Sequence, residues 1–355
     1  MAKKKNRKYL NFFLFGLFDK MEISVFIKKQ IFWMTEAKIM LQQFNAQLEK
    51  RMPIITPVSV ILGVLFAHSL HSFAFLVPWL FAFMTFAGSL SSNFRSFKEA
   101  VLHPLPIFLT LAILHIFMPL GAWAFGHLAF HGDLFTITGL TLAMAIPTGI
   151  TSFIWVSIYK GNIPLTLSVI LIDTFLSPFI VPYTVSFFIG AKVEMNTMDI
   201  MSGLIGMIVI PSLIGMLANQ CSKGKAKEVL APRLAPFSKI FLGIVVLINS
   251  SVIAPYLRHI DWKLVEIAAA VFLIAFSGYY LSFIIGRIFK LKKDTVVAMT
   301  FLGGMRNISA GAVVAVSYFP AKAAVPVVIG MLFQQILAST YGHIVDHYYR
   351  KQAKA

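Results

Sequence analysis

The sequence contains little charge, few acidic residues and a single cysteine. Only 13% of its 355 residues are charged, and Asp and Glu together number 14 against 31 Lys and Arg, whereas soluble domains carry about 25% charged residues. Hydrophobic residues make up 58% of the chain and the mean hydropathy is +0.80, which is more apolar surface than a soluble protein of this length can bury. The composition excludes a soluble enzyme and a disordered chain, and it predicts an all-α polytopic membrane protein.

Other residue types and motifs that the sequence lacks exclude further classes of function. The sole cysteine, Cys221, lies in a Lys-rich loop and indicates no disulfide. The sequence has no His-Glu-x-x-His motif and no arrangement typical of a nucleophile with its base, so we expect neither an enzyme nor a metal site nor a bound cofactor. The basic residues lie between apolar runs rather than in one patch, which indicates membrane topology and not a nucleic-acid partner.

Apolar runs separated by short polar loops predict ten transmembrane helices. They fall at 53–70, 73–90, 103–128, 137–158, 163–190, 199–219, 238–257, 264–288, 295–317 and 322–345. An even count places both termini on one side of the membrane. Beyond residue 52 and apart from Arg306, fifteen basic residues lie on that side and four on the other. The positive-inside rule then predicts a plasma-membrane protein with both termini in the cytoplasm.

The predicted organisation has four parts. Residues 1–52 hold 11 basic residues and are expected to form a cytoplasmic or membrane-surface segment, because their longest apolar run, Leu10 to Phe18, is too short to span a bilayer. Met34 is an alternative start. Residues 53–190 and 199–345 each contain five predicted spans, and residues 346–355 form a cytoplasmic tail.

Two predicted spans are interrupted by similar Gly- and Pro-rich polar segments. The similar regions run from Ala143 to Ile170 and from Ala298 to Gly330. Their polar segments, Pro147 to Ser152 and Gly303 to Gly311, each lie in the fourth span of its five. Because five is odd, the two halves lie in opposite orientations. Interrupted helices at matching positions of inverted halves are typical of a transporter binding site near the bilayer midplane. The alternative is that these are ordinary Gly and Pro kinks with no site.

Several short motifs occur in a recognisable order along the chain. They are Phe86-Ala87-Gly88-Ser89-Leu90, Phe97-Lys98, Met118-Pro119-Leu120, Pro147-Thr148-Gly149-Ile150-Thr151-Ser152, Lys160-Gly161-Asn162, Leu176-Ser177-Pro178 and Gly304-Met305-Arg306-Asn307. From about Pro53 to His343 the sequence therefore resembles the bile acid:sodium symporter family. The resemblance implies two inverted five-helix repeats, with spans 1, 2, 6 and 7 as a panel and the others as a core in which the discontinuous helices 4 and 9 cross. It also implies transport of organic anions by alternating access, usually coupled to sodium.

The sequence departs from the family at the positions of the sodium ligands. The matched positions are Leu114, Ser152, Phe153, Thr166, Ile170, Leu302 and Arg306. Sodium favours several oxygen ligands, and only Ser152 and Thr166 retain a side-chain oxygen there. Sodium is therefore disfavoured as a coupling ion. A proton-coupled or uncoupled anion carrier, and a receptor-like protein that does not transport, are the alternatives.

Two residues expected to carry a full charge, Arg306 and Asp173, lie well inside predicted spans. A charge at the bilayer centre costs at least about 2.5 kcal/mol on insertion scales, so it normally pairs or lines a polar path. We hypothesise that the Arg306 guanidinium replaces the sodium charge, and is either fixed by Asp173 or faces an anionic substrate. A structural ion pair is the alternative. His115 in the third span is a candidate proton carrier, since histidine titrates near neutral pH, or a structural hydrogen-bonding group.

The predicted partners are a small-molecule organic anion and membrane lipid. Helix ends at the two interruptions present unpaired N–H groups that can receive an anion. The predicted substrate-binding residues are Thr148, Gly149, Thr151, Ser152, Arg306, Asn307 and Gln334. Gln334 and Gln335 are adjacent in a helix and point about 100° apart, so at most one need face the cavity.

Overall fold

The computed structural model describes residues 40–41, 43–48, 51, 54–92, 104–190, 196–258 and 261–352. The chain divides into two units, Met1–Lys50 and Arg51–Ala355, and the fold below belongs to the second. Its regular structure in the described ranges is helical, apart from one isolated bridge. Most of the predicted amino-terminal segment, including Met34, lies outside the described residues, as does the loop 93–103.

Among the described residues, seven helices are long and apolar enough to cross a membrane. They are Ala67–Ser89, Pro104–Ala129, Ile163–Ile189, Thr197–Cys221, Ala226–Val252, Trp262–Ile288 and Ala321–Lys351. Three shorter apolar helices are Ile54–Leu65, Leu134–Ala145 and Ile308–Tyr318. Large apolar side chains on these helices, such as Leu128 (86% exposed) and Phe187 (83% exposed), face outward. The protein is therefore a multi-pass helical membrane protein.

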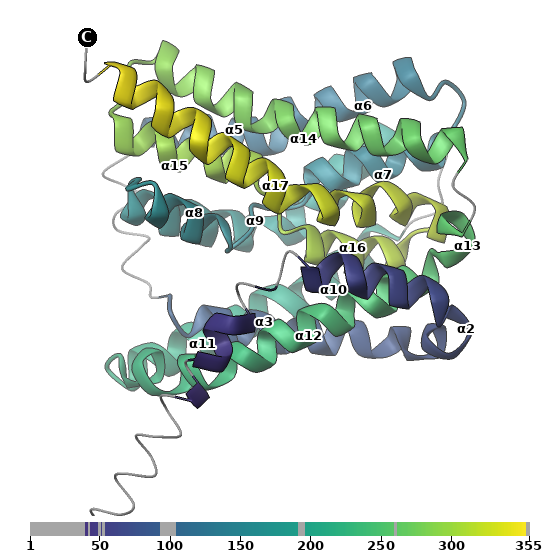
Figure 1. The fold of residues 1–355 in the computed structure, drawn as a ribbon, viewed down its shortest axis with the longest axis horizontal. Helices are drawn as coiled ribbons and strands as arrows, with labels where there is room; N and C mark the ends of the chain where they lie inside the picture. Colours follow the sequence, from purple (N-terminus) through teal and green to yellow (C-terminus); the bar gives the residue numbers. More distant parts are fainter. Residues whose placement is uncertain are drawn as a thin grey trace, which may run out of the picture. The chain divides into compact units, whose positions relative to one another are not determined.

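One layer of the fold, which we call the panel, surrounds α12 (Ala231–Val252). The helix α3 (Val77–Ser89) packs along α12 and along α11 (Ile210–Cys221), and Figure 1 draws the three together. The preceding segment consists of α2 (Ala67–Leu70) and the 3-10 helix η1 (His71–Leu76), and η5 (Ala226–Leu230) leads into α12. A Cβ atom at Gly63 would collide with the Leu247 carbonyl, so glycine permits the helix Ile54–Leu65 to lie directly against α12.

The remaining helices form a second layer, which we call the core. Its first half contains α5 (Pro104–Ala112), η2 (Ile113–Phe117), α6 (Met118–Ala129), α7 (Leu134–Ala145), α8 (Ser152–Ile158) and α9 (Ile163–Ile189). Its second half contains α14 (Trp262–Ile288), α15 (Lys293–Gly304), α16 (Ile308–Tyr318) and α17 (Ala321–Gln352). The helix α7 packs against α6 and α17, and α14 packs along α15. The helix α10 (Thr197–Leu204) continues through η4 (Ile205–Val209) into α11 and belongs to the panel. Panel and core meet where α10 contacts α9 and α16, and where α12 contacts α16.

Helix ends follow their local sequence. The side chains of Asp133, Asn162 and Asn307 each precede a helix and accept a backbone N–H from its first turn, as N-cap residues do. Asp133 also pairs with Lys263, and Lys322 lies 3.7 Å from its other carboxylate oxygen. Burial alone would raise the pKa of the Asp133 carboxyl, but hydrogen bonds from Lys263 and from the first turn of α7 outweigh it and hold the pKa below its ordinary value.

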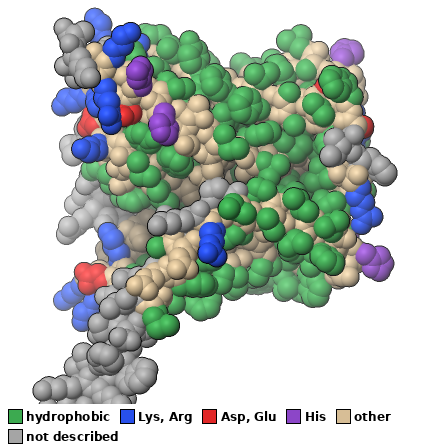
Figure 2. Space-filling model, viewed as in Figure 1, with side chains coloured by type: hydrophobic (Ala, Val, Ile, Leu, Met, Phe, Trp, Pro, Cys, Tyr) green, Lys and Arg blue, Asp and Glu red, His purple; other side chains and the backbone are tan. Residues whose placement is uncertain are grey.

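Several boundaries differ from the sequence prediction. The first two predicted spans, 53–70 and 73–90, divide near residue 66 instead, because the helices are Ile54–Leu65 and Ala67–Ser89. The span predicted at 238–257 begins earlier, because α12 starts at Ala231 after η5 and ends at Val252, followed by α13 (Ala254–Leu257). The helix α17 continues to Gln352 and so includes most of the predicted tail. On the face drawn in Figure 2, hydrophobic side chains cover the middle, and Lys and Arg side chains gather mainly at one end.

Candidate functional site

The site is built around two interruptions in the core helices. The helix α7 ends at Ala145 and α8 begins at Ser152, while α15 ends at Gly304 and α16 begins at Ile308. The predicted interruptions of the fourth and ninth spans are therefore confirmed as breaks in helical structure. An isolated antiparallel bridge between Thr148 and Arg306 joins the two breaks.

Backbone groups freed at one break bond to the other. The N–H of Asn307 donates to the Pro147 carbonyl at 2.7 Å, and the N–H of Gly149 donates to the Met305 carbonyl at 3.3 Å. Exposed backbone polar groups are costly in a membrane, so this pairing stabilises both interruptions. A Cβ atom at Gly149 would lie 2.9 Å from the Arg306 carbonyl oxygen. Glycine is therefore required for the two backbones to approach this closely.

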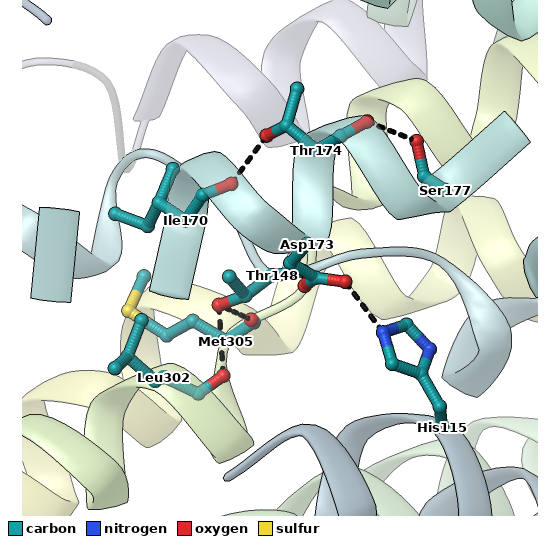
Figure 3. Close-up of polar contacts among 8 residues, drawn as sticks. All are labelled: His115, Thr148, Ile170, Asp173, Thr174, Ser177, Leu302 and Met305. Carbon is teal, nitrogen blue, oxygen red and sulfur yellow. Dashed lines mark hydrogen bonds and ion pairs between the residues drawn. The ribbon is translucent and has the colours of Figure 1, made fainter. Parts of the chain in front are cut away.

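Thr148 holds the crossing together and does not face open space. It is buried, and its hydroxyl lies 2.8 Å from the Leu302 carbonyl and 3.0 Å from the Met305 carbonyl. Its N–H donates to a carboxylate oxygen of Asp173 at 2.6 Å. Figure 3 shows Thr148 between Asp173 of α9 and the end of α15. This predicted substrate contact is thus a link between three helices.

Asp173 is paired with His115. The two side chains are joined by a 2.6 Å contact between His115 Nε2 and Asp173 Oδ1, and Asp173 is completely buried. His115 belongs to the π turn η2, where the N–H of Met118 donates to the Ile113 carbonyl. Pro119 explains this local geometry, because it has no N–H to donate to the His115 carbonyl as a regular α-helix would require.

The hypothesis that Asp173 fixes Arg306 through a direct ion pair is wrong for this structure. No ion pair joins the two side chains in the described part of the chain. They are near enough to interact electrostatically, but the carboxylate oxygens are occupied by His115 and by the N–H of Thr148. Asp173 already has partners, and Arg306 is available for another role.

Arg306 carries an unsatisfied charge at the crossing. The residue is 2% exposed, and both terminal guanidinium nitrogens, Nη1 and Nη2, are buried with no hydrogen-bond partner. Its backbone N–H donates to Gln334 Oε1 at 3.2 Å, so the backbone is held while the end of the side chain is not. An unpaired buried cation is unfavourable.

A cavity of about 280 Å³ lies between the panel and the core at this point. Its walls include both breaks, α3, α12 and α17, and five predicted substrate residues, namely Gly149, Thr151, Arg306, Asn307 and Gln334. Gln335 also lines the cavity, and its Oε1 accepts from the Trp155 indole at 3.2 Å. Both glutamines therefore line the cavity, although only Gln334 was predicted as a substrate residue. Neither Thr148 nor Ser152 is among the lining residues, and Ser152 is fully buried.

Several polar residues of this cavity were not predicted from the sequence. They are Thr56, Thr85, Ser238, Lys239 and Ser309. Lys239 is one of the fifteen basic residues counted above on the cytoplasmic side, but it belongs to α12 and lines the cavity. The signal available in the sequence was its position just inside the seventh predicted span, where a lysine is uncommon.

The positions matched to sodium ligands are poor in free oxygens. Leu114, Ile170 and Leu302 are buried apolar side chains. The Thr166 hydroxyl donates to the Asn162 carbonyl at 2.7 Å, and the Ser152 hydroxyl is buried without a partner. The two retained hydroxyls therefore have different surroundings, and one of them is already engaged in its own helix.

Comparison with known proteins assigns the chain to a family. The family model described as "Sodium Bile acid symporter family" matches residues 77–260. The Bacillus subtilis (strain 168) "Uncharacterized protein YbaS" is 56% identical over 297 residues, which cover 84% of this chain and 97% of that protein. "Uncharacterized sodium-dependent transporter YocS" from the same organism is 25% identical over 301 residues, covering 82% and 90%.

A plant relative extends the comparison. "Probable sodium/metabolite cotransporter BASS1, chloroplastic" from Oryza sativa subsp. japonica is 24% identical over 222 residues, which cover 62% of this chain and 53% of that protein. The family model matches this chain, and YbaS resembles it over most of its length. Both findings agree with the helical architecture and with the motifs at the two breaks. This chain belongs to the sodium bile acid symporter family of membrane transporters.

Proposed function

We propose that the protein is a secondary transporter that carries a small organic anion by alternating access. The observation that carries this proposal is the buried Arg306 guanidinium, whose two terminal nitrogens have no partner beside the cavity. A carboxylate or sulfonate accepts two parallel hydrogen bonds from such a planar fork and neutralises its charge. Lys239 also lines the cavity.

The size and lining of the cavity support a small substrate. Ligand pockets typically measure about 300–1,000 Å³, and this one, at about 280 Å³, lies just below that range. The amides of Gln334 and Gln335 and the backbone at the breaks offer further polar contacts. Phe81, Met84 and Leu242 contribute apolar wall on the panel side, which suits an anion with a short hydrocarbon or aromatic part.

The proposed architecture has ten spans in two inverted repeats. Seven long helices, the short helix Ile54–Leu65 and the two interrupted pairs α7–α8 and α15–α16 together supply ten crossings. The breaks then fall in the fourth and ninth crossings, as expected for inverted halves. In this proposal the panel moves against the core around the cavity. The charge distribution supports a plasma-membrane location with both termini in the cytoplasm.

Binding and uptake of matched compounds test the anion proposal. Benzenesulfonate and benzenesulfonamide have similar shapes, but only the first is charged near neutral pH. We expect the purified protein to bind benzenesulfonate, and proteoliposomes to exchange it, while benzenesulfonamide is ignored. Equal binding of the two compounds, or binding of neither, would contradict the proposal that a guanidinium selects the substrate. Unchanged flux in liposomes without protein excludes leakage as the source of the signal.

A further inference from the structure

The His115–Asp173 pair is an acid–base pair inside the membrane part of the core. When Asp173 is ionised its carboxylate can only accept hydrogen bonds, and in that state His115 Nε2 donates to Asp173 Oδ1 over 2.6 Å. In the neutral ring this leaves Nδ1 as the bare acceptor, and Nδ1 is buried with no hydrogen-bond partner. The His115 side chain is only 7% exposed. One specific nitrogen is therefore available for an additional proton.

Few other ionisable groups surround this pair. The helices α5, α7, α8 and α15 contribute no charged side chain near their breaks or centres, and α6 contributes only His127 in its last turn. From α14 the phenol of Tyr279 interacts electrostatically with Arg306, as does Asp173 from α9. Within the core, the local charge therefore depends on Asp173, His115 and Arg306, together with any bound anion. Lys239 lines the cavity from α12 of the panel and is outside this count.

The pair is connected to the cavity through Thr148. Asp173 Oδ2 accepts the Thr148 N–H, and the Thr148 hydroxyl bonds to the carbonyls of Leu302 and Met305 (Figure 3). The residue after Met305 is Arg306, which lines the cavity. A proton bound at His115 therefore changes the charge next to the crossing of the two breaks, and Arg306 belongs to that crossing.

The net charge of the core links proton binding at His115 to anion binding at Arg306. With His115 neutral and the cavity empty, Asp173 and Arg306 cancel. A monovalent anion alone brings the group to a net charge of minus one, and a proton alone brings it to plus one. Both together restore neutrality. Moving a net charge through the low-dielectric centre of a membrane protein is unfavourable, so only the empty and the doubly loaded core are free to change conformation.

We propose that His115 Nδ1, supported by Asp173, is the binding site of a coupling proton, and that the protein transports one proton with each monovalent anion. This inference rests on the proposed anion transport, because the anion enters the charge count. Transport of this kind is electroneutral. Sodium is not required, because no sodium charge enters the balance.

Proteoliposomes with a permanently ionised probe test the coupling. Benzenesulfonate is suitable because, unlike a carboxylate, it does not cross the bilayer as a neutral acid. An inside-alkaline gradient of one pH unit is expected to support about tenfold accumulation, equally in sodium and potassium buffers and independently of an imposed membrane potential. Accumulation driven by a sodium gradient at equal pH, or by membrane potential, overturns the proposal.

Two variants give distinct signatures. In Asp173→Asn the loaded core is neutral without a proton but the empty core is positive, so exchange persists while pH-driven accumulation is lost. In His115→Gln the loaded core keeps its negative charge, so benzenesulfonate binds but is neither exchanged nor accumulated. His127→Gln is the matched control, because His127 bonds to the Trp123 carbonyl on its own helix, and it should behave as wild type. Retained pH-driven accumulation in both test variants contradicts the inference.

The failures of the two proposals are distinguishable. If anion transport itself is wrong, wild type neither binds nor exchanges benzenesulfonate, or Arg306→Gln has no effect on either. If only the proton inference is wrong, exchange depends on Arg306 but net accumulation does not follow the pH gradient.

Discussion

Replacing Arg306 with glutamine separates a substrate-binding role from a structural one. In the structure the two terminal guanidinium nitrogens are buried and lack hydrogen-bond partners, while the Arg306 backbone is held by Gln334. A side chain in this condition destabilises the empty protein, because its lost hydration is not replaced. The substitution should therefore weaken anion binding without weakening the fold.

The expected loss of affinity follows from the bonds available. Each hydrogen bond to a charged group contributes about 1.5–3 kcal/mol, and Nη1 and Nη2 can each donate one to a carboxylate or sulfonate. Loss of both corresponds to about 3 kcal/mol or more, which is about a hundredfold or greater increase in Kd. Arg306→Lys keeps the charge but not the planar fork, so its affinity should lie between those of wild type and Arg306→Gln.

Isothermal titration with benzenesulfonate measures the affinity, and melting curves in the same detergent measure the stability of the fold. We expect the Tm of Arg306→Gln without ligand to equal or exceed that of wild type, while the affinity falls. Arg287→Gln is the matched control, because Arg287 lies over the Tyr348 ring at 4.4 Å and outside the cavity, and it should leave the affinity unchanged. A lower Tm with unchanged affinity would mean that Arg306 is a structural cation.

Two further predictions concern the fold around the site. Gly304→Ala places a Cβ atom into the ring of Tyr279 and should cost about 1–3 kcal/mol, seen as a lower Tm, whereas Gly121→Ala meets no atom within 4 Å and should be tolerated. An equal Tm for the two variants would contradict the packing argument. Asp133→Asn retains an N-cap but loses the ion pair with Lys263. Since the pKa of Asp133 is lowered from its ordinary 3.8, the Tm difference from wild type should be complete above that pH and disappear as pH falls below it. A difference that persists at low pH would contradict this assignment.

Much of the fold could be predicted from the sequence because its signals are local. Apolar runs long enough to cross a bilayer coincide with the long helices, and the Pro- and Gly-rich segments coincide with the breaks at 146–151 and 305–307. The importance of Arg306 and Asp173 was also readable, because a charge within an apolar run is costly wherever the run is placed. Five of the seven predicted substrate residues line the cavity.

The errors share a physical cause. Side-chain direction follows a regular period only inside helices and strands, so within an irregular break the sequence could not tell that Thr148 faces Asp173 and α15 while Gly149 and Thr151 face the cavity. The start of α12 was also predicted too late, since the helix begins at Ala231 and the predicted span at residue 238. Boundary residues of this kind depend on packing as well as on local composition.

The sequence by itself determined that the chain is a membrane protein, where its spans lie, where two of them break and which charges lie inside, because each depends on composition over a short window. Only the tertiary structure decided which charges meet. His115 and Asp173 are 58 residues apart yet in contact, and this pairing leaves the guanidinium of Arg306 without a partner. Contacts between distant segments depend on how whole helices pack, and no local pattern specifies which of the two available partners a buried carboxylate will take.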